Sequence, residues 1–487
     1  MNNRLLGQIA TIIMSVGLAV PLPAVAAEEI GTSDSKGIAL TIYNQNFGVV
    51  KDVRLLPLKA GLNIVRFSDV AAQIDPTSVS LQSLSSPNSL AIREQNYQFD
   101  LIDPTTILSK SIGKTLKFRQ ILQNGSVSEF TGVLLNSPTA VVANSNGGNE
   151  TRYSGLVIKT DKGIILNPEG QIELAELPPG LISKPSLVWR LETSKAGENT
   201  AEVAYQTQGL NWKCDYVAVL NAADNELGLT SWVTLDNKSG ATYPNASLKL
   251  LAGDVHRVTP AQPAMEMETR GMYADQAKPQ FQEQAFAEYH LYTLQGKTDV
   301  RDNETKQLSL FNADKIPVKK LFIFDPDSGY SYDQQNPDKR KIQIKIEVEN
   351  SEKNGLGMPL PKGKVRVYKK DSDAALQFIG EDEIDHTPHN EKIRLYIGDA
   401  FDIVGERKLM RTDNPNPHTQ RETFEVSLRN HKKTPVTITV LHHPNGDWIV
   451  ANSTIPAIRK SANNLEFNVN VVPEQESKFS YTIQTRF

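Results

Sequence analysis

The stretch from Lys341 to Glu349, which reads Lys-Ile-Gln-Ile-Lys-Ile-Glu-Val-Glu, alternates apolar and polar residues without interruption. Successive side chains of a β-strand point to opposite faces, so this alternation places one face in a core and the other in water. The same pattern occurs from Phe424 to Leu428 and from Leu465 to Val471. Strands with one wet face are typical of antiparallel sheets, which predicts a fold rich in antiparallel β-structure.

The rest of the chain extends this prediction. Short stretches with strand character follow one another and are separated by Gly, Pro, Asn and Asp, which is typical of β-sandwiches and barrels. No long stretch has the helical period, which argues against the α/β folds that bind dinucleotides. We therefore predict a mainly β protein of several antiparallel β-sandwiches, with a small β-barrel in the N-terminal half.

Changes in composition predict where these domains begin and end. The expected regions are a signal peptide (1–27), an N-terminal β region (37–104), a small barrel-like domain (105–179) and a large β region (187–487). The last region is too long for one ordinary sandwich, so we expect two packed β units with a break near residues 325–339. Residues 259–287 have no clear period and predict a mobile insertion.

The N-terminus predicts export. Arg4 precedes a short apolar core from Ile9 to Val20, which is followed by prolines and by small residues from Ala24 to Ala27. This is the layout of a secretory signal peptide. The alternative is a membrane anchor, but the apolar run is shorter than the ~20 residues that a bilayer span needs. We expect a periplasmic or extracellular protein with no transmembrane segment after signal cleavage.

Charge and cysteine content exclude several classes of function. The 487 residues include 52 basic and 56 acidic ones, a formal net charge of -4, whereas nucleic-acid-binding proteins usually carry a basic excess. The single cysteine, Cys214, excludes an intrachain disulfide and a cysteine-based zinc cluster. Cys214 shares one strand face with Trp212 and Tyr216, so we expect it to be a small buried residue rather than a nucleophile.

Several motifs in the second half of the chain carry a family resemblance. They are Tyr205–Trp212, Trp232–Gly240 with Tyr243 and Asn245, Leu251–Asp254, Leu360–Tyr368, Ile379–Asp382 and Asp385–Pro388. In this order they resemble the domain-of-unknown-function 4139 family of exported bacterial proteins, which is distantly similar to mucoidy-inhibitor proteins. The resemblance covers about residues 187–487. It implies an exported β protein and no agreed activity, because the family has no catalytic residues to carry over.

His386 and His389 are candidates for metal ligands. Asp385 and Glu391 flank them, and imidazole and carboxylate groups suit zinc. Pro388 makes the segment extended, and no third or fourth ligand is evident, which favours a polar turn.

Two other sets of residues have side chains that bind metal ions in other proteins, but their arrangement favours other interpretations. His442 and His443 are adjacent in a strand and should point to opposite faces, so we interpret them as a pair at a hairpin edge. Asp325, Asp327 and Asp333 are suggestive of a calcium loop but lack the order of an EF-hand, which favours a solvated loop.

Two further patterns support alternative functions. Met265 and Met267 lie in the expected insertion, and thioethers suit Cu(I), although methionine also fills apolar contacts. The run Glu381-Asp382-Glu383 could supply the two carboxyl groups of a glycoside hydrolase, although acidic runs usually form solvated faces.

The sequence favours a non-enzymatic protein of the cell envelope that binds another protein or a surface polymer through its β scaffold and loops. This interpretation rests on the rigid β scaffold with many loops, which is typical of binding proteins. It also rests on the lack of a recognisable catalytic set or cofactor motif in the sequence. One alternative is an envelope hydrolase acting on carbohydrate or peptide. A second is copper handling through the methionine-containing segment.

Overall fold

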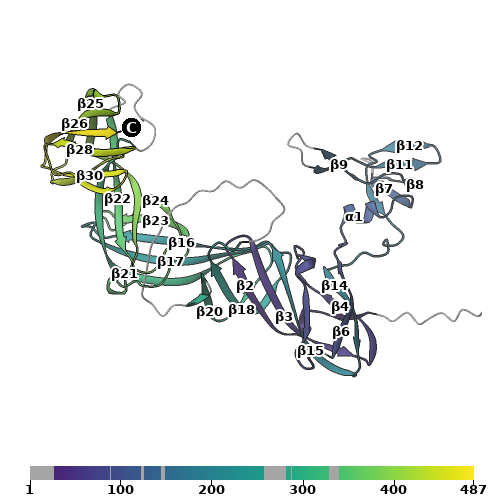
Figure 1. Cartoon of the computed structure of the whole chain (residues 1–487). Helices are drawn as coiled ribbons and strands as arrows, with labels where there is room; N and C mark the ends of the chain where they lie inside the picture. Colours follow the sequence, from purple (N-terminus) through teal and green to yellow (C-terminus); the bar gives the residue numbers. More distant parts are fainter. Residues whose placement is uncertain are drawn as a thin grey trace, which may run out of the picture. The chain divides into compact units, whose positions relative to one another are not determined.

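The computed structural model describes residues 27–87, 89–121, 125–143, 149–256, 281–286, 288–327 and 339–486. Strands dominate these residues, and the helices are one short α-helix, α1 (Pro104–Ser109), and three single 3₁₀ turns (Figure 1). The turns are η1 (Thr32–Asp34), η2 (Pro76–Ser78) and η3 (Glu352–Asn354). The prediction of a mainly β fold is confirmed. None of the helices in the described part of the chain is long and apolar enough to cross a bilayer.

The described chain forms two compact units, each made of three sequence segments. The first comprises the described part of Met1–Ser35, together with Arg54–Val70 and Gln82–Ala201, and the second comprises Lys36–Val53, Ala71–Leu81 and Glu202–Phe487. The units therefore interleave parts of the chain, which differs from the consecutive regions expected from the sequence. The predicted signal peptide and most of the 259–287 insertion lie outside the described residues.

A four-stranded sheet in the first unit has the order β1-β4-β14-β6. Its strands are β1 (Glu28–Ile30), β4 (Gly61–Ser68), β6 (Leu90–Gln98) and β14 (Ser186–Thr193). Trp189 on β14 is fully buried and meets Phe67 edge-on. The buried Arg54 guanidinium stacks on the same Phe67 ring and donates hydrogen bonds of 2.8 Å to the carbonyl oxygens of Ile30 and Ser68. Residues 28–30 therefore form an edge strand of this sheet, ahead of residue 37, where the N-terminal β region was expected to begin.

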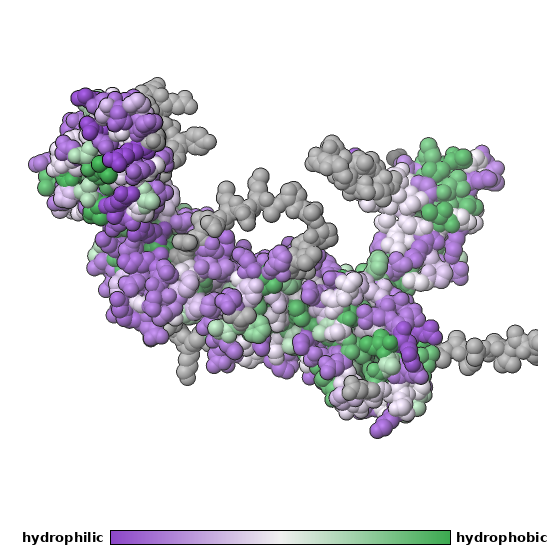
Figure 2. All heavy atoms as spheres, in the orientation of Figure 1, coloured by the Kyte–Doolittle hydropathy of each residue, from purple (hydrophilic) through white to green (hydrophobic). Residues whose placement is uncertain are grey.

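A small five-stranded sheet, also in the first unit, has the order β12-β11-β8-β7-β13, and a separate hairpin pairs β9 with β10. The strands are β7 (Thr115–Ile121), β8 (Val127–Leu134), β9 (Thr139–Ala143), β10 (Asn149–Tyr153), β11 (Val157–Thr160), β12 (Gly163–Leu166) and β13 (Gln171–Glu173). Among the described residues β12 and β13 form the two edges and do not pair with each other, so no closed barrel is detected there and the small barrel stays a prediction. Figure 2 shows hydrophobic residues over this part of the chain, where Ile164 and Leu166 of β12 are exposed.

A seven-stranded sheet has the order β19-β20-β18-β2-β3-β15-β5. Its strands are β2 (Ser35–Tyr43), β3 (Phe47–Leu58), β5 (Ser80–Ser83), β15 (Gly197–Gln208), β18 (Tyr243–Ala252), β19 (Phe281–Phe286) and β20 (Tyr289–Val300). Strands far apart in the sequence pair here, since β18 runs parallel to β2 with Ser247 opposite Ala39.

The largest sheet, in the second unit, follows the path β24-β23-β16-β17-β21-β22-β25-β26-β31-β28, and β27, β29 and β30 branch from it. Its strands are β16 (Leu210–Leu220), β17 (Glu226–Asn237), β21 (Glu304–Phe324), β22 (Lys339–Glu349), β23 (Gly363–Lys370), β24 (Leu376–Ile384), β25 (Lys392–Asn416), β26 (Thr419–Asn430), β27 (Val436–His442), β28 (Asp447–Ser453), β29 (Ile458–Ser461), β30 (Asn464–Val471) and β31 (Gln475–Arg486). Figure 1 shows β16, β17 and β21 side by side.

The long strand β21 joins two parts of this sheet. Its first residues pair with β17, and its last residues, from Val318 onward, pair with β22 and β27. Beyond it, the side chains of β26, β28 and β31 pack with those of β27 and β30 around Trp448 and Phe467, which forms the C-terminal sandwich (strands β22 and β25–β31). Strand β21 therefore connects the β16–β17 part of the sheet to the C-terminal sandwich.

Candidate functional site

A cavity of about 400 Å³ opens at the beginning of β16 and β23, and we call it the β16–β23 pocket. Its walls come from four segments that are distant in the sequence. These are Asn44 after β2, residues 211–215 of β16, residues 361–364 and 366 at the start of β23, and Glu383 and His386 at the end of β24. Three of the four segments belong to the motifs that carry the family resemblance.

The backbone of β16 and β23 explains why the pocket lies here. The two strands pair in parallel from Cys214 opposite Gly363 onward, whereas residues 210–213 of β16 pair only with β17. The chain therefore diverges just before Gly363 and leaves an opening. A side chain at Gly363 would overlap the carbonyl oxygen of Cys214 and would come within 2.8 Å of Tyr216 Cε2. Close approach of the two backbones thus requires glycine at this position.

His386 is the largely buried histidine of the pocket, and its surroundings fix its protonation. The backbone N–H of Lys362 donates to His386 Nδ1 over 3.1 Å, so Nδ1 carries no proton. The ring is then neutral with its hydrogen on Nε2, which lies 3.0 Å from the Asn44 side-chain amide. An amide oxygen facing Nε2 accepts this hydrogen, and this orientation satisfies Asn44 Oδ1, which is otherwise buried without a partner. Burial also lowers the pKa of His386.

These hydrogen bonds occupy both ring nitrogens of His386. The other candidate, His389, is exposed on the turn that follows, and Asp385 accepts a hydrogen bond of 2.8 Å from the backbone N–H of His386. The structure therefore does not bring these residues together as a ligand set. In the parts of the chain that the structure describes, no group of three or more His, Cys, Asp or Glu is placed to hold a metal. Met265 and Met267 lie outside the described residues.

The lowered pKa of His386 predicts a pH dependence of stability. The unfolded chain takes up this proton near pH 6.5, whereas the folded protein does so only at lower pH. Stability from this site is therefore fully present above about pH 6.5 and decreases as the pH falls from there through the folded pKa. Denaturant unfolding should show that His386→Gln loses less stability than the unaltered protein between pH 7.5 and 5.5.

The exposed His389 provides the control for this experiment. His389→Gln alters the same turn but leaves the hydrogen bonds of His386 intact, so it should keep the pH dependence of the unaltered protein. Equal pH dependence in all three proteins would show that His386 is not held neutral by its neighbours.

Charge is the second property of the pocket. Its walls carry four cationic side chains, Lys213, Lys362, Lys364 and Arg366, against two carboxylates, Asp215 and Glu383. The whole chain has a formal net charge of -4, so this cationic surplus is local. Among the described residues the ammonium groups of Lys213 and Lys362 have no hydrogen-bond or ion-pair partner, and Lys362 is half-buried. The pocket therefore favours an anionic ligand group.

The carboxylate of Asp215 is already engaged by its neighbours. Thr234 Oγ1 donates to Asp215 Oδ2 over 2.7 Å, and Arg366 NH1 lies 3.4 Å from Oδ1. Arg366 Nε also lies 3.7 Å from Glu381, which accepts from Lys364 Nζ over 3.1 Å. The acidic run that includes Glu381 is therefore partly neutralised by cations of β23 rather than only solvated.

Cys214 has no reactive environment. Its side chain is buried, and burial raises the pKa of the thiol to about 12, so the thiolate needed for nucleophilic attack is not populated near neutral pH. The predicted burial of Cys214 together with Trp212 and Tyr216 is confirmed.

The acidic residues before the 328–338 segment are not a solvated loop, which corrects the expectation for Asp325 and Asp327. Both oxygens of Asp327 accept hydrogen bonds from the Arg407 guanidinium, and Oδ2 also lies 3.0 Å from His442 Nδ1. His443 donates its backbone N–H to Asp327 over 2.9 Å, and its Nε2 lies 3.2 Å from Asp325. The side chains of His442 and His443 contact different carboxylates, in a hydrogen-bonded cluster around the Arg407–Asp327 ion pair. Asp333 lies outside the described residues.

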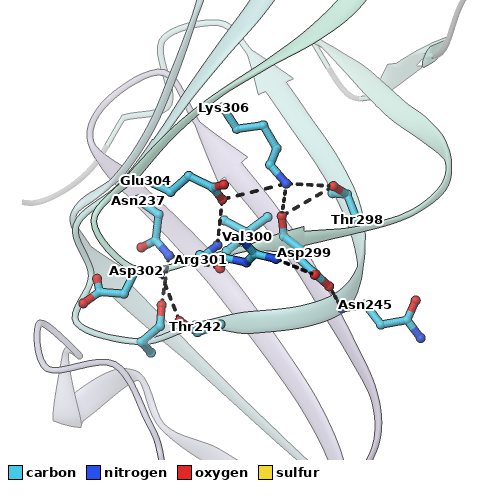
Figure 3. A network of polar contacts seen from close by, with 11 residues as sticks. Asn237, Thr242, Asn245, Thr298, Asp299, Val300, Arg301, Asp302, Glu304 and Lys306 are labelled. Atoms are coloured by element: carbon cyan, nitrogen blue, oxygen red, sulfur yellow. Dashed lines mark hydrogen bonds and ion pairs between the residues drawn. The ribbon is translucent and has the colours of Figure 1, made fainter.

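The motif Trp232–Gly240, which is part of the family resemblance, has a structural role. At the end of β17, Asn237 donates its amide hydrogens to the carbonyl oxygens of Ala241 (2.9 Å) and Val300 (3.3 Å). Asp302 accepts the backbone N–H of Gly240 over 3.0 Å (Figure 3). The side chains in Figure 3 therefore tie the β17–β18 turn to the β20–β21 turn. Gly240 lies in the β17–β18 turn with a φ of 82°, a conformation that glycine adopts without a steric cost.

Sequence reasoning missed Lys213, Lys362, Lys364 and Arg366 as site residues. Lys364 and Arg366 alternate with Val365 and Val367 in a motif that was noticed only for its resemblance, and this alternation places both cations on the wet face of a strand. Only the fold reveals that β16 supplies the opposite wall. No protein-family model matches the chain, and no curated protein matches it significantly.

Proposed function

We propose that this protein is an exported, non-enzymatic protein of the cell envelope that binds an anionic segment of a surface polymer in the β16–β23 pocket. The observation that carries the proposal is the local surplus of cationic side chains, with the ammonium groups of Lys213 and Lys362 left without a partner among the described residues. An ammonium group that is partly removed from water gains from a bound anion, because the surrounding dielectric is lower there.

The chemistry of the neighbouring groups supports binding rather than reaction. Both nitrogens of His386 are used in hydrogen bonds, Asp215 is held by Thr234 and Arg366, and Cys214 is a buried thiol. A general base or nucleophile needs a free lone pair within reach of its substrate. These groups are better suited to keep the shape of the pocket.

The proposal of export rests on the N-terminal sequence and on the family resemblance. The positive residue Arg4, the short apolar core and the small residues before Ala27 support cleavage of a signal peptide. Expression of the full chain followed by cell fractionation and mass measurement tests this. A processed protein outside the cytoplasm is expected, and an uncleaved cytoplasmic protein would contradict export.

A binding experiment tests the proposed ligand. The chain from Glu28 onward should bind polygalacturonate, a polymer with one carboxylate per sugar, with saturation, and should not bind neutral dextran. The affinity should fall as salt is raised, because salt screens charges that are exposed to solvent. Lys213→Gln combined with Lys362→Gln should weaken binding at least tenfold.

Lys297 provides a matched control, because it is an exposed lysine of β20 that does not line the pocket. Combined with Lys249→Gln, at another exposed lysine outside the pocket, Lys297→Gln removes the same two charges from the protein, so this double variant should leave the affinity nearly unchanged. Equal losses in the two double variants would show that only net charge matters. Absence of saturable polygalacturonate binding would contradict the proposed function.

A further inference from the structure

One tryptophan differs from the other three in its exposure. Trp189, Trp212 and Trp448 are 0%, 2% and 1% exposed, whereas Trp232 on β17 is 37% exposed. A large indole ring contributes most to the stability of a fold when it is buried, so an exposed ring contributes less. This contrast indicates that Trp232 is available to contact something outside the fold.

The strand register shows what surrounds Trp232. Trp232 lies opposite Asp215 on β16 and opposite Ser309 on β21, and Asp215 in turn lies opposite Lys364 on β23. Paired residues project from the same face of a sheet. Lys364, Asp215, Trp232 and Ser309 therefore form one row across four strands.

The neighbouring rows on this face are also polar. On one side, Lys213 lies opposite Thr234, and Gln307 donates to Thr234 Oγ1 over 3.1 Å. On the other side, Thr230 donates to Asn312 Oδ1 over 2.7 Å. We call these three rows, completed by Arg366 and Val217, the outer face of β23, β16, β17 and β21. Figure 2 shows a mainly hydrophilic surface over β16 and β17.

A single aromatic ring on a polar sheet face limits the class of partner that can bind there. The core of a protein–protein interface is rich in apolar and aromatic residues and poor in charges, whereas here Trp232 is isolated among polar groups. A nucleic acid would need a stronger basic excess than a chain of net charge -4 offers. A sugar ring fits both features, because its C–H face stacks on an indole and its hydroxyl groups bond to polar neighbours.

We propose that the outer face is a saccharide-binding surface, on which Trp232 stacks against one sugar ring of an acidic polysaccharide. Lys364, on the same row two strands away, donates one of its three ammonium hydrogens to Glu381 and directs another at a carboxylate of the sugar chain. Two strand spacings amount to about 10 Å, which a disaccharide spans. Lys213 and Lys364 also line the β16–β23 pocket, so the polymer continues from the outer face into it. This inference rests on the proposed function and adds the class of polymer and the residue that recognises it.

Tryptophan fluorescence offers a direct test, because Trp232 is the exposed one of the four tryptophans. Acrylamide should quench part of the emission, and saturating oligogalacturonate should reduce this quenching. Trp232→Phe should remove the quenchable part, whereas the emission of the three buried tryptophans should stay.

Affinity measurements complete the test. Trp232→Ala should weaken oligogalacturonate binding at least fivefold, and Trp232→Phe should weaken it less, because a phenyl ring still stacks. Phe286 is an exposed aromatic residue of β19 outside this face, so Phe286→Ala should bind normally. Thermal unfolding should be nearly unchanged in Trp232→Phe and Phe286→Ala. Trp232→Ala removes a ring that is only 37% exposed and should unfold at a lower temperature, so its affinity is compared well below that transition.

The outcomes separate the inference from the proposed function. If polygalacturonate binds, but Trp232→Ala binds it equally well and quenching is not reduced, the saccharide surface is wrong and the proposed function stands. If a polyanion without sugar rings, such as polyglutamate, reduces the quenching of Trp232 equally well, recognition of sugar is also refuted. If no polyanion binds the unaltered protein, the proposed function itself fails.

Discussion

Replacing Asp327 by alanine is expected to destabilise the C-terminal sandwich by about 3 kcal/mol, because it leaves a partly buried guanidinium without its counter-ion. Asp327 pairs with Arg407 through both carboxylate oxygens, and Arg407 also lies over the Phe424 ring, 5.0 Å from its centre. Water reaches neither group freely, since their side chains are 23% and 15% exposed. The cluster connects the residues after β21 to β25 and to the end of β27.

The pKa of Asp327 gives this prediction a pH window. Burial alone would raise the pKa, but the hydrogen bonds from His442 and Arg407 outweigh burial and hold it well below its usual range. Because the folded pKa is lowered, the stabilisation is present above the unfolded pKa of about 4 and is lost as the pH falls below it. The difference between Asp327→Ala and the unaltered protein should therefore be largest at neutral pH.

Hydrogen–deuterium exchange can locate the effect, since a protein with several units need not unfold in one step. A loss of about 3 kcal/mol corresponds to roughly 100-fold faster exchange of peptides in β25 and β27. Asp413 also pairs with an arginine, Arg411, at 3.0 Å, but that arginine is 72% exposed. Asp413→Ala should change exchange little. Similar small changes in both variants would show that the Asp327 pair is as weak as a surface pair.

This cluster also marks the limit of what the sequence predicts. Alternation correctly predicted that Trp212, Cys214 and Tyr216 share a buried face, because the side-chain period of a strand is a local property. The acidic residues at 325 and 327 have the composition of a solvated loop. Only the return of β25 and β27 beside them supplies Arg407 and His442, and such long-range pairing has no local signature in one sequence.

In the pocket, too, the sequence predicts local strand features but not long-range pairing. The wet positions of Lys364 and Arg366 on β23 follow from their alternation with Val365 and Val367, whereas Asn44 and His386 lie just outside the ends of strands. What the pattern does not contain is the neighbour of each strand. β16 pairs in parallel with β23, almost 150 positions later, and β2 brings Asn44 to His386 from the beginning of the chain. Composition suggested His389 as a partner of His386 because the two are near in sequence, whereas the actual partners of His386 are Asn44 and Lys362.

Adding a single methyl group at Gly363 should destabilise the pocket by about 2–3 kcal/mol, as expected for overpacking in a dense region. A Cβ there would overlap the carbonyl oxygen of Cys214, which belongs to the backbone of the central strand β16 and cannot rotate away. Gly363→Ala must therefore separate the first pairs of β16 and β23. These pairs form the edge of the pocket, so polygalacturonate affinity should decrease together with stability.

Gly37 is the matched control for this substitution. It also lies in a strand, β2, but a Cβ at Gly37 meets nothing within 4 Å, and its φ is not positive. Gly37→Ala should be neutral or slightly stabilising, because alanine restricts the unfolded chain more than glycine does. Exchange should accelerate in β16 and β23 peptides of Gly363→Ala and remain unchanged in Gly37→Ala. If Gly363→Ala exchanged and bound like the unaltered protein, the two strands could not approach as closely as the pocket requires.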